Sequence, residues 1–213
     1  PGEIPRPRTI KMVRARPSQV RAPTWEQMDA CVHACTGWQT QVATVLRYTG
    51  LRVSTVMLLE WRDINLEHET LNLRCEVVKE RTGRLIPISS HLCTEIAGWG
   101  TREGYLIESG RKKGPRHRMV RARDFARAWD RAGVPAEVRT MPTHAFRKGF
   151  KSRMLQDGAH PDAVDFLQGH AFAGGSRGRY IDISSLNLEA TVARIPRIKD
   201  NGNSVRLHLI GSG

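Results

Sequence analysis

Two histidines, an arginine and a tyrosine toward the C-terminal end are the residues best suited to chemistry on a phosphodiester. His144 and Arg147 stand in the sequence THAFR, and His170 ends the sequence LQGH. Tyr180 follows ten residues after His170. Phosphodiester transfer without a metal needs a nucleophile, cations around the two non-bridging oxygens, a base and an acid. Tyrosine, arginine and histidine can supply the first three of these.

Two arginines are placed where a guanidinium could bind a phosphate. A helix that begins near Thr143 would put His144 and Arg147 one turn apart on one face, beside the positive potential of the helix N-terminus. Arg52 follows a helix-ending glycine in the sequence TGLR, and a guanidinium binds phosphate oxygens in pairs. Taken singly, each arginine also fits a surface charge, and His144 also fits a helix cap.

Tyr180 differs from the other two tyrosines of the chain. It lies in a basic, glycine-rich stretch from Gly174 to Arg179, which is a poor setting for core packing. Tyr48 and Tyr105 stand near apolar residues, and we expect both to be structural. Tyr180 is therefore the candidate nucleophile.

The charge balance of the chain favours a nucleic-acid partner. The 213 residues include 34 Lys and Arg against 21 Asp and Glu, a formal net charge of +13. Such an excess is typical of proteins that bind a polyanion. A membrane surface would also attract this charge, but the sequence has no run of about 18 apolar residues and no signal-like apolar segment.

The four cysteines suggest neither a zinc site nor a disulfide framework. Cys31, Cys35, Cys75 and Cys93 are scattered and form no CxxC pair, which favours a reducing, cytosolic setting. Cys31 and Cys35 lie four apart with His33 between them, and we expect them to pack in the interior rather than bind metal. No metal or other cofactor is predicted.

The hydrophobic pattern predicts a series of helices interrupted by one short β region. Thr24 can cap a helix over 25–35, with Gln27 at the capping-box position. Short β-like runs at 71–73, 75–78 and 84–88, with a turn at 81–83, suggest a small antiparallel sheet. Further helices are expected at 40–48, 51–59, 90–99, 121–132, 144–156, 161–168 and 185–193.

The two ends of the chain and one internal segment have a different composition. Residues 1–22 are rich in Pro and Arg and are expected to form an arm or linker. Residues 196–213 are expected to form a tail, with a strand candidate at 205–210 that could pack on a neighbouring protomer. The densest basic cluster is expected to contact DNA phosphates, with a solvated loop as the alternative; it contains Arg111, Lys112, Lys113, Arg116 and Arg118.

In order and context, these motifs resemble those of the tyrosine recombinases of the phage-integrase type. The family's motifs run Arg, Lys, His-x-x-Arg, His or Trp, and Tyr, and TGLR, a hairpin lysine, HAFR, LQGH and Tyr180 follow in the same order. The resemblance covers about Thr24 to Arg194. It implies a mixed α+β fold, mainly helical with a small antiparallel three-stranded sheet, and one catalytic domain over 23–195. It also implies a metal-free enzyme that cuts and rejoins double-stranded DNA.

The resemblance also implies a role for each motif residue. Arg52 and Arg147 would clamp the scissile phosphate, and His170 would hydrogen-bond it. His144 would orient Tyr180 and help to deprotonate it. Tyr180 would then attack phosphorus, expel the 5′-hydroxyl and remain joined to the 3′ end of the DNA.

Lys79 is the candidate general acid. Arg81 and Arg84 compete for this role, but an arginine stays protonated near neutral pH, whereas the pKa of a lysine can be tuned. The family usually has its lysine on a β-hairpin about eight residues before a proline, and Lys79 and Pro87 match that spacing.

Two positions depart from the family pattern. Thr55 stands where the family commonly has an acidic residue, three after Arg52, so a partner of the site is missing or replaced. The interval from His170 to Tyr180 is ten residues instead of about nine, and its glycines predict a mobile tyrosine loop.

The resemblance implies a homo-oligomer, a tetramer on DNA, located in the cytoplasm with nucleoid, viral or mobile-element DNA. Family members usually carry a further N-terminal DNA-binding domain, so we expect a fragment or a short form. Two alternatives remain. An enzyme like the type IB topoisomerases would nick and close DNA without exchanging strands between duplexes. A non-catalytic basic DNA-binding protein would form no covalent adduct.

Overall fold

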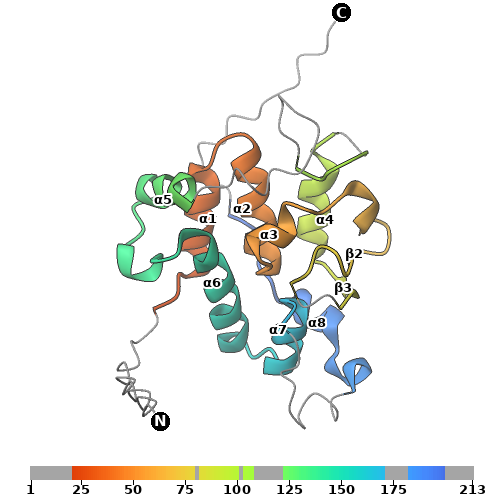
Figure 1. Ribbon diagram of the computed structural model, residues 1–213. Helices are drawn as coiled ribbons and strands as arrows, with labels where there is room; N and C mark the ends of the chain where they lie inside the picture. The colour runs from red at the N-terminus through yellow and green to blue at the C-terminus, as the bar shows by residue number, and fades with distance from the viewer. Residues whose placement is uncertain (1–20, 80–81, 101–102, 108–121, 171–181, 200–213) are drawn as a thin grey trace, which may run out of the picture.

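The computed structural model describes residues 21–79, 82–100, 103–107, 122–170 and 182–199, which form a mainly helical body with one small sheet at its edge (Figure 1). This architecture confirms the predicted fold class. Within the described part, no helix is both long enough and apolar enough to cross a membrane. Four helices pack against one another in the body, namely α1 (Trp25–Ala34), α2 (Trp38–Thr49), α5 (Ala122–Arg131) and α6 (Pro142–Gln156).

α1 begins at the predicted cap, whereas α2 begins two residues before the predicted position and ends at the predicted glycine. The Thr24 hydroxyl accepts a hydrogen bond from the Gln27 amide (3.2 Å), and the Gln27 side chain accepts one from the Thr24 amide (3.0 Å). α2 ends at Gly50, which has a left-handed φ of 59°. Both Cys31 and Cys35 are buried among apolar residues of the core.

The sheet consists of three short antiparallel strands in the order β1-β2-β3. The predicted strand at 75–78 is wrong, because these residues form turns in which Val77 and Val78 are both buried. A strand at an exposed edge would instead alternate between buried and exposed positions. The strands are β1 (Ile64–Asn65), β2 (Thr70–Leu73) and β3 (Arg84–Pro87), and Leu73 pairs with Arg84.

The helix predicted at 51–59 is much shorter in the structure. Only α3 (Val53–Val56) is α-helical, and a 3-10 turn follows at Trp61–Asp63. The Leu106 amide donates to the Leu59 carbonyl (2.8 Å). This hydrogen bond to a segment almost fifty residues away takes the place of a helical one at Leu59. The apolar spacing alone could not reveal this pairing.

Besides the four helices of the body and α3, the structure describes three more α-helices, α4 (Ser90–Ala97), α7 (Pro161–Leu167) and α8 (Leu188–Val192). α8 contacts both α7 and β3. The left-handed Asn187 (φ 41°) separates α8 from a preceding 3-10 helix, so the helix predicted at 185–193 is divided in two. After α8 the chain returns to α2, where the Ile198 amide donates to the Tyr48 hydroxyl (3.0 Å). The 3-10 helix before α8 spans Ile183–Leu186.

Candidate active site

Arg147 lies at the centre of the predicted site and is only 4% exposed. Its Nη1 donates to the carbonyls of Gly50 (2.9 Å) and Gln168 (2.7 Å). In return, the buried Gln168 side chain donates to the Arg147 carbonyl (2.8 Å). These bonds join the end of α2, the middle of α6 and the end of α7, so the guanidinium has a fixed position.

Gly50 is required at this junction for two reasons. Its positive φ favours glycine, and a Cβ at this position would lie 2.5 Å from Gln168 Nε2 and 2.8 Å from the Phe150 ring. The TGLR motif therefore does more than end a helix. It lets the backbone approach the Arg147 guanidinium closely.

Arg52 lies next to this junction at the N-cap of α3 and is half-buried. Its Nη1 donates to the Gly169 carbonyl (3.4 Å). Arg147 binds the carbonyl of the preceding residue, Gln168. The two arginines, 95 residues apart in sequence, therefore converge on the same turn at the end of α7.

His144 occupies the third position of α6, with an exposed side chain. The pKa of His144 lies below its ordinary value, first because neighbouring atoms partly desolvate the ring and then because the positive charges of Arg147, Lys148 and Arg52 disfavour the imidazolium. The ring is thus neutral at neutral pH and able to accept a proton. Its electrostatic neighbours also include His170, which places four predicted site residues in one region.

His170 is held by a carboxylate that the sequence reasoning missed. Its Nδ1 lies 2.7 Å from Oδ1 of Asp165, and the same oxygen accepts from Lys151 Nζ (2.5 Å). Burial is the main cause that lowers the pKa of His170, and the hydrogen bond to Asp165 opposes it. A sequence signal existed, an acidic residue five positions before the histidine at a helix end, but it does not stand out in a charged chain.

Lys79 is exposed on the connection between β2 and β3, and it makes no hydrogen bond or ion pair with any residue that the structure describes. The connection is anchored two residues earlier, where the buried Thr55 hydroxyl donates to the Val77 carbonyl (3.1 Å). The residue that departs from the family pattern thus holds the loop that carries Lys79.

Arg84, one of the competitors of Lys79, contacts the same turn at the end of α7 that Arg52 and Arg147 bind. Its Nη1 donates to the carbonyls of Phe166 (3.3 Å) and His170 (3.4 Å), and its guanidinium lies over the Phe166 ring at 5.3 Å. Arg84 therefore docks the β2–β3 hairpin on the end of α7. The remaining site predictions fall outside the described residues, namely Tyr180, Arg81, Arg111, Lys112, Lys113, Arg116 and Arg118.

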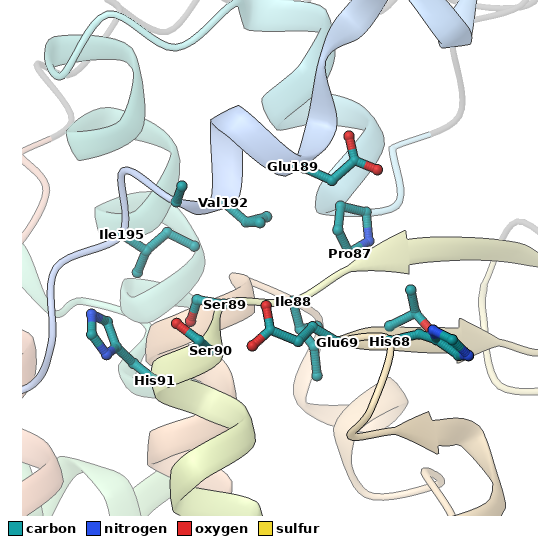
Figure 2. Close-up of a pocket in the computed structure, with 12 residues that line it drawn as sticks. His68, Glu69, Pro87, Ile88, Ser89, Ser90, His91, Glu189, Val192 and Ile195 are labelled. Atoms are coloured by element: carbon teal, nitrogen blue, oxygen red, sulfur yellow. The ribbon is translucent and has the colours of Figure 1, made fainter.

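A cavity of about 220 Å³ lies elsewhere, where the sheet meets the start of α4 and α8. Figure 2 shows Ser89 and Ser90 on one side of it and Val192 and Ile195 on the other. None of its lining residues belongs to the predicted site. Its lining includes two glutamates and no lysine or arginine, so its chemistry does not suit a DNA phosphate.

Comparisons with known proteins identify relatives of this chain. The prophage integrase IntZ of Escherichia coli K12 is 27% identical over 179 residues, which are 81% of this chain and 42% of that protein. The tyrosine recombinase XerA of Pyrococcus furiosus is 29% identical over 157 residues, which are 72% of this chain and 53% of that protein. This chain spans about half the length of these curated relatives.

Among solved structures, the integrase from mycobacterium phage Brujita has a similar fold, with a TM-score of 0.65 at 19% identity. The match covers 92% of this chain and 63% of that one. The model of the phage integrase family matches residues 24–185, from the cap of α1 to the 3-10 helix before α8. The chain therefore belongs to the phage integrase family.

Proposed function

We propose that this chain is the catalytic domain of a site-specific DNA recombinase that cuts and rejoins strands through a covalent 3′-phosphotyrosine. The observation that carries the proposal is the convergence of Arg52, Arg147, His144 and His170 around the end of α7. Two permanent cations and two titratable rings in one place match the needs of a phosphodiester, whose two non-bridging oxygens carry the charge. The names of the relatives support the same reaction class.

The arginines stabilise the phosphate and its transition state. Arg147 is fixed by the carbonyls of Gly50 and Gln168, so little reorganisation is needed when charge develops on the oxygens. Arg52 approaches from α3 and supplies the second guanidinium. Two arginines held by different elements can bind the two non-bridging oxygens from different directions.

The transfer itself needs a nucleophile and two proton movements. Tyr180 attacks phosphorus through its oxygen while the bond from phosphorus to the 5′ oxygen breaks. His144 accepts the phenolic proton, which its lowered pKa allows. His170, as its imidazolium, donates a hydrogen bond to the phosphate. Lys79 protonates the departing 5′ oxygen. The reverse attack by a 5′-hydroxyl rejoins the strand and frees the tyrosine.

The charge of the chain supports double-stranded DNA as the partner. The excess of 13 positive charges includes the basic segment 111–118, which we assign to phosphate contacts. We further propose that residues 1–22 form a basic arm, that 23–195 form the catalytic unit, and that the chain works as a homotetramer on nucleoid or mobile-element DNA. Residues 196–199 pack on the chain's own helices through Ile198, which leaves the tail beyond them for contacts between protomers.

The decisive experiment is a covalent-trapping assay. A nicked suicide duplex, taken from the DNA that flanks the native gene, is incubated with the protein and analysed on a denaturing gel. We expect an adduct with the wild-type chain and none with Tyr180→Phe, while both bind the duplex equally well. An adduct that survives the substitution removes Tyr180 as the nucleophile. A wild-type chain that nicks and closes one duplex but never joins strands of two labelled duplexes is not a recombinase.

A further inference from the structure

Asp165 binds two side chains that point at it from different directions. Its Oδ1 accepts from Lys151 Nζ on α6 (2.5 Å) and lies 2.7 Å from Nδ1 of His170. The Asp165 side chain is 30% exposed and that of His170 is 34% exposed, so both are shielded on most of their surface. Among the residues that the structure describes, Asp165 is the carboxylate that contacts His170.

The backbone explains why an aspartate five residues earlier meets the histidine. Gly169 has a left-handed φ of 72°, which reverses the chain after α7. The His170 amide then donates to the Asp165 carbonyl (2.9 Å), and the Gly169 amide donates to the Phe166 carbonyl (3.0 Å). This pair of bonds is the Schellman motif, in which the second residue beyond the helix folds back over the last turn. His170 is thereby bonded to Asp165 through both its backbone and its ring.

The charge state of Asp165 decides which ring nitrogen carries the proton. Burial alone would raise the pKa of Asp165, but the hydrogen bonds from Lys151 and His170 lower it overall. The carboxylate is therefore ionised at neutral pH and can only accept hydrogen bonds. Nδ1 of His170 must then be the donor, which leaves Nε2 as the nitrogen that faces away from Asp165 and gains or loses the titrating proton.

We propose that Asp165 is a positioning residue that fixes the ring and the tautomer of His170, so that Nε2 is the atom presented to the scissile phosphate, with Lys151 holding Asp165 in place. The proposal rests on the proposed function only in taking a DNA phosphate as the substrate. A similar partnership orients metal-bound and catalytic histidines in other sites, where the carboxylate controls the ring without touching the substrate.

Asp165 also supplies the negative charge in a cationic environment. The groups around His170 are Lys151, Arg147 and His144 from α6, Arg84 from β3 and Asp165 from α7. Every one of these other than Asp165 is cationic or becomes so on protonation. Loss of the Asp165 charge should therefore make the imidazolium of His170 harder to form.

The tautomer can be measured without any DNA. We expect nitrogen NMR of histidine-labelled wild-type chain, above the pKa of His170, to show the neutral ring protonated at Nδ1. Asp165→Ala should move the proton to Nε2, the form preferred by a free imidazole, whereas the control Asp162→Asn, on the same helix, should leave the His170 signals unchanged. His170→Gln identifies the resonance. A wild-type ring protonated at Nε2, or an Asp165→Ala ring still protonated at Nδ1, overturns the proposal.

The trapping assay then measures the consequence for cleavage. Asp165→Asn should lower adduct formation by roughly 10- to 100-fold, the scale for losing an outer partner of a functional histidine. It should also move the loss of activity at high pH to a lower pH, because less imidazolium forms. An equal loss at every pH marks Asp165 as merely structural and contradicts the proposal. Failure of the wild-type chain to form any adduct would overturn the proposed function, while the NMR result would still decide the role of Asp165.

Discussion

Arg147 and Lys79 belong to one proposed site, but the first is buried and the second is exposed to solvent. Arg147 is buried and held by two backbone carbonyls from different elements. Lys79 is exposed on the connection between two short strands, and its nearest described anchor is the bond from Thr55 to the Val77 carbonyl. The Arg147 guanidinium is part of the core, whereas the Lys79 ammonium lies on an exposed connection of the sheet.

The difference follows from what each cation is proposed to do. An arginine never gives up its proton, so it can be buried where carbonyl dipoles compensate its charge, and burial strengthens its pull on a phosphate. A lysine that acts as an acid must reach the leaving oxygen, lose a proton and regain it from water. The contrast predicts that changes at Arg147 affect both stability and chemistry, whereas changes at Lys79 affect chemistry alone.

The largest effect is expected for Arg147→Ala. Its loss should lower adduct formation by about 100-fold or more, the scale for losing a preorganised contact to developing charge. It should also lower the free energy of unfolding by on the order of 2 kcal/mol, since the Gly50 and Gln168 carbonyls lose a charged donor. Urea unfolding measures the second quantity. The control is Arg127→Ala, which removes an exposed arginine. An equal loss of unfolding free energy in Arg127→Ala would show that the effect does not come from the buried setting of Arg147.

Lys79→Ala should impair cleavage by about 100-fold, the lower end for general acid catalysis, with no change in urea unfolding. A duplex with sulfur at the bridging 5′ position has a leaving group that departs without a proton. Cleavage of that duplex by Lys79→Ala should return nearly to the wild-type rate, whereas Arg52→Ala should gain little. Lys199→Ala is the matched lysine control. Rescue of Arg84→Ala instead of Lys79→Ala would show that the acid is misassigned.

Gly169→Ala tests the turn that both arginines and His170 share. A Cβ would meet no atom within 4 Å, so the cost comes only from the left-handed backbone and should be about 1 kcal/mol of unfolding free energy. Cleavage should fall by roughly 5-fold, because about 1 kcal/mol shifts the turn population by about that factor. Gly133→Ala, also left-handed and unhindered, is the control and should lose stability but not activity.

Thr55→Val removes the anchor of the Lys79 connection while keeping the shape of the side chain. The loss of one buried hydrogen bond should cost about 1 kcal/mol and lower cleavage of normal DNA by a few-fold. Because Thr55 acts through Lys79, the sulfur-bridged duplex should remove the cleavage defect but not the stability loss. Thr55→Ser, which keeps the hydroxyl, should behave as wild type. A defect that persists on the sulfur-bridged duplex would separate Thr55 from the acid.

The smallest expected effect is a pH dependence of stability. Both His144 and His170 have pKa values below the ordinary 6.5, so the folded chain binds fewer protons than the unfolded chain in the window just below pH 6.5. The free energy of unfolding should therefore rise with pH across that window and level off above it. The double variant His144→Gln, His170→Gln should flatten the rise in urea titrations between pH 5 and 7. An unchanged slope would show that other groups cause it.

Much of the local architecture could be predicted from the sequence. The capping box at Thr24, the end of α2 at Gly50 and the start of α6 near His144 all depend on bonds between residues a few positions apart. The fold class was predicted correctly. The errors lie where distant segments meet, as at 51–59, where the Leu106 amide binds the Leu59 carbonyl, and at 75–78, where Thr55 binds Val77.

The sequence by itself determined which residues are proposed to carry the chemistry, because Arg, His, Lys and Tyr are recognised by their type and order along the chain. Only the tertiary structure decided how they are supported. The carbonyls that fix Arg147 come from residues 97 and 21 positions away, and the second donor to Asp165 comes from 14 positions away. No local pattern marks such a partner, since a carbonyl or a carboxylate acquires its role only when folding brings a donor within hydrogen-bond distance and excludes water from around it.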